Sequence, residues 1–283
     1  MWAAEPPTAT ARDVALACAN GLRDEDLRER LRASIHALEA NSATYQRMAI
    51  DGTLGSLDED YLVDSSLSAD ELRWLYDNRL AKNTSPARPL YNALLASAPR
   101  GRCVYCFFTD ASSLDHFAPK QRFAQLAIEP WNLVPSCHVC NNTWNSKEKS
   151  SKTGASMHPY AMPPIGRWLY ATVSSEPALA VTFYAQPDHR FPSEIAESII
   201  HNFERLQLGD RLAKHSSVEI AFLQAILRSF AGDLTGAASF VAETAAAEFE
   251  AHPNNWRGAL FEAASANVAL LARFESNPID AWQ

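Results

Sequence analysis

Apolar residues in the first hundred positions recur at the spacing of α-helices. One apolar side is formed at intervals of three or four residues by Leu27, Leu31, Ile35 and Leu38. Ser68 and Glu71 have the spacing of a capping box, so a helix is expected to begin there. The apolar side of that helix carries Leu72, Leu75, Tyr76 and Leu80. Residues 51–56 are expected to form a loop, and Pro89–Ala96 a short helix after a break at 83–86.

The last part of the chain predicts a hairpin followed by helices. Residues 167–173 and 178–184 are expected to form two β-strands around a turn that contains Pro177. Ser216 is expected to cap a helix with the apolar residues Val218, Phe222, Leu223, Ile226, Leu227 and Phe230. Two more helices are expected at 236–251 and 256–275. We interpret these apolar stripes as core.

Between Arg100 and Lys152 the pattern changes to cysteines, prolines, asparagines and short apolar runs. Such a segment predicts short strands and loops that hold candidate functional residues, and it does not show the apolar spacing of core helices. The expected fold class is therefore α+β, with a small metal-binding module set into a mostly helical body. The expected regions are an N-terminal helical region (1–99), the module (100–160), and a hairpin with C-terminal helices (161–283).

Composition narrows the class of protein. The chain has 283 residues, of which 47% are hydrophobic and 20% charged, so it can bury a sizeable core. This excludes disordered and low-complexity classes. The chain has no run of 18 apolar residues, and its first residues lack the basic and apolar regions of a signal peptide. We therefore expect a soluble, cytoplasmic protein with no membrane partner.

The charge is acidic overall but basic in the cysteine-rich segment. The formal net charge is −8, from 25 basic and 33 acidic residues, which argues against a protein that coats nucleic acid over its whole surface. Residues 100–152 carry +3, whereas the rest of the chain carries −11. A nucleic-acid site is therefore expected to be local, and a partner protein is expected to supply additional binding surface.

Four of the five cysteines form two C-x-x-C pairs, Cys103 with Cys106 and Cys137 with Cys140. In a reducing compartment this spacing favours a tetrahedral thiolate zinc site over disulfides. Four thiolates leave no open position for water, so the zinc would be structural. The alternative, a redox pair, leaves the second pair unexplained. Cys18 lies in an apolar run and is expected to be a small buried residue.

Polar motifs lie between and beside the two cysteine pairs. In chain order they are Asp115-His116, Pro119-Lys120, Asn132-Leu133 and Cys140-Asn141. Over about fifty residues the chain resembles the HNH endonuclease family. The resemblance implies a ββα-metal fold, in which an Asp-His strand, a loop asparagine and the start of a helix surround one catalytic divalent ion.

The resemblance also implies roles for single residues. His116 would take a proton from water, because a neutral imidazole is a proton acceptor near pH 7. Asp115 and Asn141 would hold Mg²⁺ or Mn²⁺, and Asn132 would hold the loop that positions the base. Because adjacent strand residues point to opposite faces, Asp115 and His116 share a site only where the strand ends or is distorted.

The chain departs from the family at the helix. The frequent Cys-Asn-x-x-Lys pattern is not kept, since the lysine here is Lys147, so Asn145, one helical turn past Asn141, is the alternative ligand. Asn142 would point about 100° away from Asn141 on an α-helix. Lys120 and Lys147 are candidate phosphate contacts, and His138 is expected to be exposed.

Flanking segments resemble one bacterial group of HNH proteins. They are Leu72–Tyr76, Arg88–Leu95, Leu114–Phe117 and Asn132–Cys137. The group includes the nuclease subunit of Septu-type anti-phage systems and nucleases of some retrons, which implies DNA as substrate and an ATPase or other defence-system protein as partner. The competing hypothesis is a non-catalytic zinc module that binds nucleic acid or scaffolds a partner protein.

Overall fold

The computed structural model describes residues 2–145, 157–162, 166–174, 180–230 and 232–267. The chain is α+β, as expected, with helices and two small antiparallel sheets. It forms two compact units, residues 1–164 and 165–283. The expected N-terminal helical region and cysteine-rich module thus belong to one unit. Among the described residues, no helix combines the length and apolar character that a membrane crossing requires.

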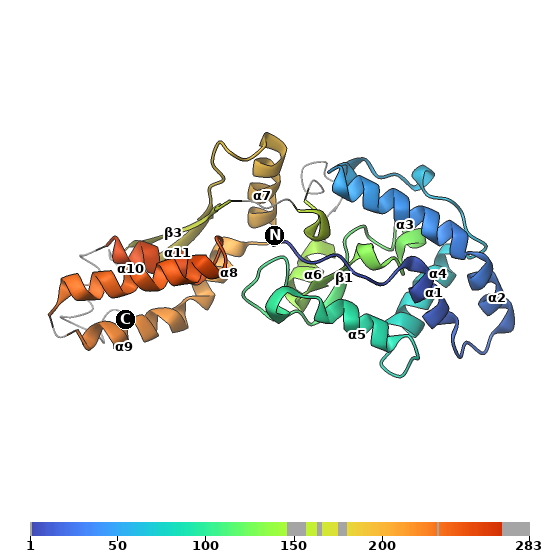
Figure 1. Ribbon diagram of the computed structural model, residues 1–283, viewed down its shortest axis with the longest axis horizontal. Coiled ribbons are helices and arrows are strands. Elements are labelled where there is room, and N and C mark those ends of the chain that lie inside the picture. Colours follow the sequence, from blue (N-terminus) through green and yellow to red (C-terminus); the bar gives the residue numbers. More distant parts are fainter. Residues whose placement is uncertain (1, 146–156, 163–165, 175–179, 231, 268–283) are drawn as a thin grey trace. The chain divides into compact units, whose positions relative to one another are not determined.

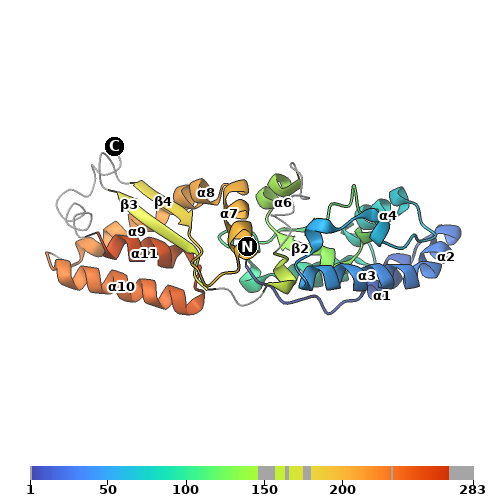
Figure 2. The same ribbon diagram turned by 90° about the horizontal axis from the view of Figure 1, so that it is seen from above.

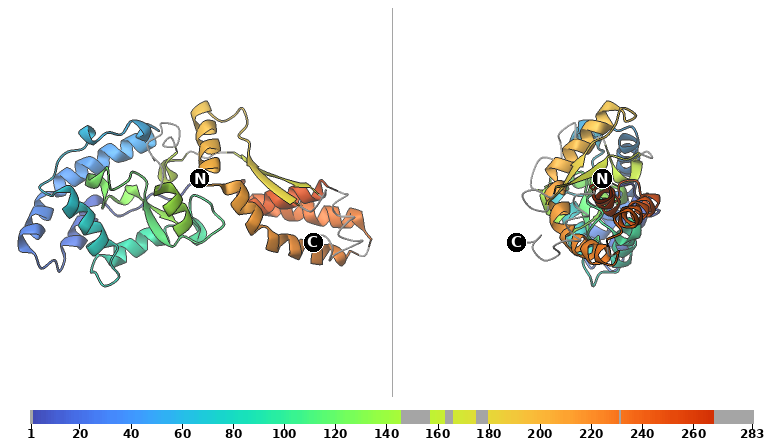
Figure 3. Two further views of the ribbon diagram at one scale, coloured as in Figure 1. Left: turned by 180° about the vertical axis from the view of Figure 1, so that it is seen from behind. Right: turned by 90° about the vertical axis from the view of Figure 1, so that its left-hand side faces the viewer.

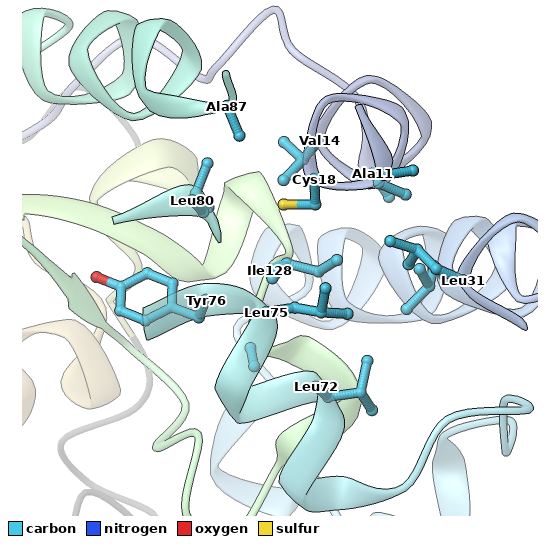
Figure 4. Packing of buried hydrophobic residues seen from close by; sticks show 14 of the residues in the cluster. Ala11, Val14, Cys18, Leu31, Leu72, Leu75, Tyr76, Leu80, Ala87 and Ile128 are labelled. Carbon is cyan, nitrogen blue, oxygen red and sulfur yellow. The ribbon is translucent and has the colours of Figure 1, made fainter. Parts of the chain in front are cut away.

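Five α-helices build most of the first unit (Figure 1). They are α1 (Ala11–Ala19), α2 (Glu25–Ala33), α3 (Ile35–Ile50), α4 (Ala69–Leu75) and α5 (Arg88–Ala96). Short 3₁₀ turns connect the elements of this unit at Leu54–Ser56, Glu59–Tyr61, Pro99–Gly101, Ala124–Leu126, Pro130–Asn132 and Pro159–Ala161. The helices share one buried apolar cluster with Leu114 and Leu133 of the module, which fixes the module against them. Figure 4 shows part of this cluster, with Leu31 and Leu72 from the helices beside Ile128 of the module.

Two details of the N-terminal helices were visible only in part from the sequence. The four apolar residues from Leu27 to Leu38 are all buried, but they belong to two helices that meet at Ser34. The Ser68–Glu71 capping box is confirmed, since both reciprocal hydrogen bonds are present. The helix that it begins then widens into a π-helical turn at Tyr76–Leu80. Such turns are rare and often lie at functional sites.

The cysteine-rich segment forms a small ββα arrangement. Strand β1 (Ser113–His116) pairs antiparallel with β2 (Leu133–Ser136), and helix α6 (His138–Asn145) follows directly. Asp115 lies opposite Val134, and His116 lies opposite Leu133. Helix α5 contacts both strands and α6 contacts β1. His116 is the last residue of β1 and is still paired with Leu133.

The second unit contains the expected hairpin and helices. Strands β3 (Leu169–Ser174) and β4 (Ala180–Ala185) pair antiparallel, and β3 packs on α11 (Figure 2). The helices are α7 (Ser193–Arg205), α8 (Leu208–His215), α9 (Ser217–Arg228), α10 (Leu234–Ala251) and α11 (Trp256–Ser265). Helices α10 and α11 form a packed pair (Figure 3).

Three expectations for this unit need correction. Ser216 does not cap α9: the chain is already helical there, and its hydroxyl donates to the Ala213 carbonyl instead. The apolar stripe of α9 is not all core, because Val218 and Phe222 are exposed. The last helix ends at Ser265 and not at 275; residues 268–275 lie outside the described residues.

Candidate functional site

The four paired cysteines converge on one point. Their sulfur atoms all lie within 4.8 Å of one another, and all four residues are buried. Cys106 Sγ and Cys137 Sγ are 4.0 Å apart, and none of the cysteines is in a disulfide. Zinc–sulfur bonds of about 2.3 Å in a tetrahedron place sulfur atoms about 3.8 Å apart. The cluster therefore fits a metal ion such as zinc.

Local hydrogen bonds help to place the cysteine sulfur atoms of the cluster. The Cys140 amide, in the first turn of α6, donates to Cys137 Sγ at 3.3 Å, and Cys106 Sγ lies 3.1 Å from the Thr109 hydroxyl. Hydrogen bonds with neighbouring thiols lower the pKa of Cys137, whereas burial raises the pKa of Cys103. A bound cation stabilises thiolates, so metal binding and thiol deprotonation are linked.

Cys18 takes no part in this cluster. Its side chain lies in the apolar interior with Val14, Leu80 and Ile128 (Figure 4). Burial raises the pKa of its thiol to about 12, which keeps it protonated and unreactive near neutral pH. Its interpretation as a small buried residue is confirmed.

Asp115 is fully buried in β1, and its carboxylate is bonded to a residue of the 103–106 turn. The hydroxyl of Tyr105, which lies between Cys103 and Cys106, donates a hydrogen bond of 2.8 Å to Asp115 Oδ2. A buried carboxylate needs such donors, because leaving water is costly for a charged group. The Tyr105 hydroxyl therefore helps to orient the Asp115 carboxylate.

Asn141 lies on the first turns of α6 and reaches the same face of β1 as Asp115. Its side-chain nitrogen donates to Ser113 Oγ at 3.1 Å and lies 3.5 Å from the Leu114 carbonyl oxygen. Ser113 and Asp115 are two residues apart in a strand, so their side chains share one face. Asn141 is half-buried. The structure thus brings the two expected oxygen ligands to one side of β1.

His116 closes β1 and is held by a different set of neighbours. Its Nε2 lies 2.9 Å from the Ala127 carbonyl oxygen, and its ring packs at 4.3 Å, nearly edge-on, against Tyr76 of the π-helical turn. A carbonyl only accepts hydrogen bonds, so neutral His116 carries its proton on Nε2. The lone pair then lies on Nδ1. This is the tautomer in which Nδ1 is the proton acceptor.

Asn132 holds the loop that supports His116. Its Oδ1 accepts from the Ala118 amide at 2.6 Å and from the Tyr45 hydroxyl at 3.0 Å. Its Nδ2 donates to the carbonyls of Ala118 and Leu126 at 2.9 and 3.0 Å. All four hydrogen-bonding positions of the amide are used. Leu126 directly precedes Ala127, whose carbonyl holds His116, so this amide positions the imidazole through the loop.

Of the remaining candidate residues, the structure describes the side chains of Lys120 and His138. Lys120 Nζ is paired with Asp77 at 2.5 Å and lies 4.6 Å from the centre of the Tyr76 ring. A phosphate would have to compete with Asp77 for that ammonium. His138 is exposed, as expected, and lies 3.1 Å from Asn142. Lys147 and the side chain of Asn145 lie outside the described residues.

Several residues of the site were not singled out in the sequence. Tyr105 carries a signal, because it lies inside the first C-x-x-C pair. Tyr45, in α3, carries none. Tyr76 is expected only on the apolar side of its helix and in a flanking segment, with no indication that it contacts His116. Glu129 is buried, and its Oε1 accepts hydrogen bonds from the Ser42 hydroxyl and the Trp131 amide. Burial raises the pKa of Glu129 to about 7.

Comparison with known proteins gives one distant relative. The chain is 25% identical over 216 residues to "Protein ea31" of Escherichia phage lambda, which covers 72% of this chain and 73% of that protein. No family model matches the chain. No solved structure matches it either.

Proposed function

We propose that this protein is a metal-dependent nuclease of the HNH type that hydrolyses phosphodiester bonds. The observation that carries the proposal is the ββα arrangement itself: Asp115 and Asn141 share one face of β1, and His116 ends that strand. The fixed Nε2 hydrogen bond of His116 supports the proposal further. The name of the phage relative states no activity, so the proposal rests on this chain's own residues.

In this proposal His116 supplies the base. Water is a poor nucleophile near neutral pH, so its proton must be removed as it attacks phosphorus. Nδ1 of His116 takes that proton, while Ala127 holds Nε2 and keeps the ring in place. Asn132 acts at a distance, because its hydrogen bonds fix the loop that carries the Ala127 carbonyl.

Asp115 and Asn141 would hold Mg²⁺ or Mn²⁺. A carboxylate and an amide oxygen suit these ions, which keep several waters and take further ligands from substrate phosphate. The bound ion would stabilise negative charge on the phosphoryl and leaving oxygens. The Asn141 amide can turn its oxygen outward, since carbonyl and amine ends are interchangeable in shape.

The four cysteines would bind structural zinc. In this role the ion fixes β1 relative to α6, because Cys137 and Cys140 flank the start of the helix and the first pair carries Tyr105. Structural zinc supplies folding free energy outright. Substituting any one of the four cysteines by serine is expected to unfold the module.

Plasmid cleavage tests the proposed reaction. Wild-type protein with Mg²⁺ or Mn²⁺ should nick supercoiled DNA, and His116→Ala should lose at least about 100-fold in rate while keeping its zinc. His138→Ala is the matched control, because His138 is an exposed histidine of the same module. Cleavage by His116→Ala at the wild-type rate would remove His116 from the role of base.

A non-catalytic zinc module is the competing function. It is favoured by the complete burial of Asp115 and by the ion pair that Asp77 already makes with Lys120. This alternative predicts nucleic-acid or protein binding without cleavage in either metal. The two functions therefore give opposite results in the plasmid assay when a partner is supplied.

A partner protein is part of the proposal. DNA is the proposed substrate, and an ATPase or another component of a defence system is the proposed partner. The chain's net charge of −8 supports the need for additional binding surface. The relative belongs to a phage, so it does not itself favour an anti-phage role.

A further inference from the structure

We propose that Tyr105 is a positioning residue through which the four-cysteine cluster controls the affinity of the Asp115 site for a divalent ion. This role rests on the proposed nuclease function. It makes the four-cysteine cluster a regulator of the proposed ion site at Asp115. The Tyr105 hydroxyl connects two parts of the module. One is the 103–106 turn, which carries two of the cysteines, and the other is Asp115 on β1.

The contact between Tyr105 and Asp115 lies entirely inside the protein. Both residues are fully buried, and the hydroxyl lies 2.8 Å from Asp115 Oδ2. A hydrogen bond to a charged group contributes more to stability than a hydrogen bond between neutral groups. Losing it removes one of the groups that orient the Asp115 carboxylate and weakens a ligand geometry that depends on this orientation.

The cluster determines where Tyr105 lies. Cys103 and Cys106, on either side of it in the chain, both contribute sulfur to the cluster. The Cys103 amide donates to the Thr109 carbonyl, and the Val104 amide donates to the Pro135 carbonyl of β2 at 3.3 Å. Pro135 is paired with Leu114, the residue before Asp115. The 103–106 turn is thus connected to the four-cysteine cluster through its own cysteines and to the β1–β2 sheet through the Val104 amide.

Coupling between the two metal sites follows from this connection. Metal on the cysteines holds the 103–106 turn, and the turn holds the hydroxyl against Asp115. Thermodynamic linkage requires the effect to be reciprocal, so an ion at Asp115 must tighten zinc binding by the same factor.

Manganese binding to Tyr105→Phe tests the proposal directly. The variant keeps the buried ring and removes only the hydroxyl. We expect one zinc per chain, as in wild type, and a Mn²⁺ dissociation constant raised about 10-fold or more, measured from free Mn²⁺ by electron paramagnetic resonance. Cleavage should need correspondingly more Mn²⁺ and approach the wild-type rate at saturation.

Tyr160→Phe is the matched control. Tyr160 is also buried in this unit, but its hydroxyl donates to the Leu133 carbonyl at 2.8 Å. Its Mn²⁺ affinity should equal that of wild type. Equal affinity in Tyr105→Phe as well would overturn the positioning role and leave the nuclease proposal intact. Wild-type protein that neither binds Mn²⁺ nor cleaves DNA would instead contradict the nuclease proposal.

Zinc release gives a second test that needs no folded variant. Saturating Mn²⁺ should slow the transfer of zinc from the wild-type protein to a colorimetric chelator by several-fold. Zinc release at the same rate with and without Mn²⁺, in protein shown to bind Mn²⁺, would contradict the coupling. Where Tyr105→Phe is folded, the Mn²⁺ effect on zinc release should disappear in it.

Discussion

At the scale of single residues, buried polar groups organise the site. Asn132, Asp115 and His116 are all buried and each has a hydrogen bond to a fixed partner. In a low-dielectric interior such bonds are difficult to replace, because water cannot reach the groups that lose them. Substitutions at these positions are therefore expected to affect stability and geometry together.

Asn132→Ala should be strongly destabilising. The change leaves the Tyr45 hydroxyl, the Ala118 amide and two carbonyls without their partner in a buried region. We expect a loss of about 3 kcal/mol or more in the free energy of unfolding, measured by urea denaturation. Asn142→Ala, an exposed asparagine nearby, should change it by less than about 0.5 kcal/mol. Similar small losses in both variants would contradict the role of Asn132.

Glu129 should make stability depend on pH. Burial raises its pKa in the folded protein to about 7, so the folded state holds this proton more tightly than the unfolded chain. Its contribution to stability is fully present below the ordinary glutamate pKa and is lost as pH rises toward 7. Glu129→Gln keeps an oxygen for Ser42 and removes the charge. It should raise Tm by about 3–6 °C more at pH 8 than at pH 5; the same shift at both pH values would contradict this assignment.

At the scale of elements, the two serines expected to cap helices behave differently. Ser68 is in extended conformation and bonds the Glu71 amide, whereas Ser216 follows α8 with helical backbone angles. A capping serine needs an extended backbone so that its hydroxyl can reach the first free amides. The same residue type therefore has different functions at these two positions.

Hydrogen exchange distinguishes the two serines. Ser68→Ala removes a cap worth about 1 kcal/mol, so the first amides of α4 should exchange about five-fold faster. Ser216→Ala should leave the first amides of α9 within about two-fold of wild type, since the Ser216 hydroxyl bonds a carbonyl of the preceding helix. Equal acceleration in both helices would show that both serines act as caps.

The sequence predicts the helices and strands better than it predicts which elements pack against them. The α5 helix, the hairpin and α10 were all visible, because apolar spacing and turn residues are local signals. The break at Ser34 was missed, since one apolar stripe continues across both helices. The exposure of Val218 and Phe222 was missed because the stripe shows which residues are apolar and not which neighbours cover them.

In the candidate site, too, local sequence spacing predicts some features, whereas contacts between distant segments could not be predicted. Convergence of the four cysteines followed from their spacing alone, because two C-x-x-C pairs suit one ion. The contacts of Tyr45 and Tyr76 with the module could not be predicted, since they join segments that only tertiary packing brings together. Asp77 was likewise not anticipated as the partner of Lys120.

At the scale of the whole molecule, every described residue proposed for chemistry lies in the first unit. Its apolar cluster includes helices on one side and strand residues Leu114 and Leu133 on the other. A chain of residues 1–164 should therefore fold, bind one zinc and unfold cooperatively, as measured by calorimetry and metal analysis. A zinc-free or aggregated product would show that the first unit depends on residues 165–283.

Charge pairing predicts weak DNA binding by the isolated protein. Each of Arg102, Lys120 and Arg122 lies beside a carboxylate, and the chain as a whole is acidic. In sedimentation at low salt, the purified chain should bind duplex DNA only weakly. Tight binding that weakens steeply with salt would argue against a required partner.

The most direct measurement is the position of Mn²⁺ in crystals, located by anomalous scattering. We expect a manganese peak bound by Asp115 and Asn141, within one water of His116 Nδ1, and a separate zinc peak among the four cysteine sulfurs. A zinc peak with no manganese beside Asp115, in crystals soaked at saturating Mn²⁺, would rule out the proposed catalytic ion site.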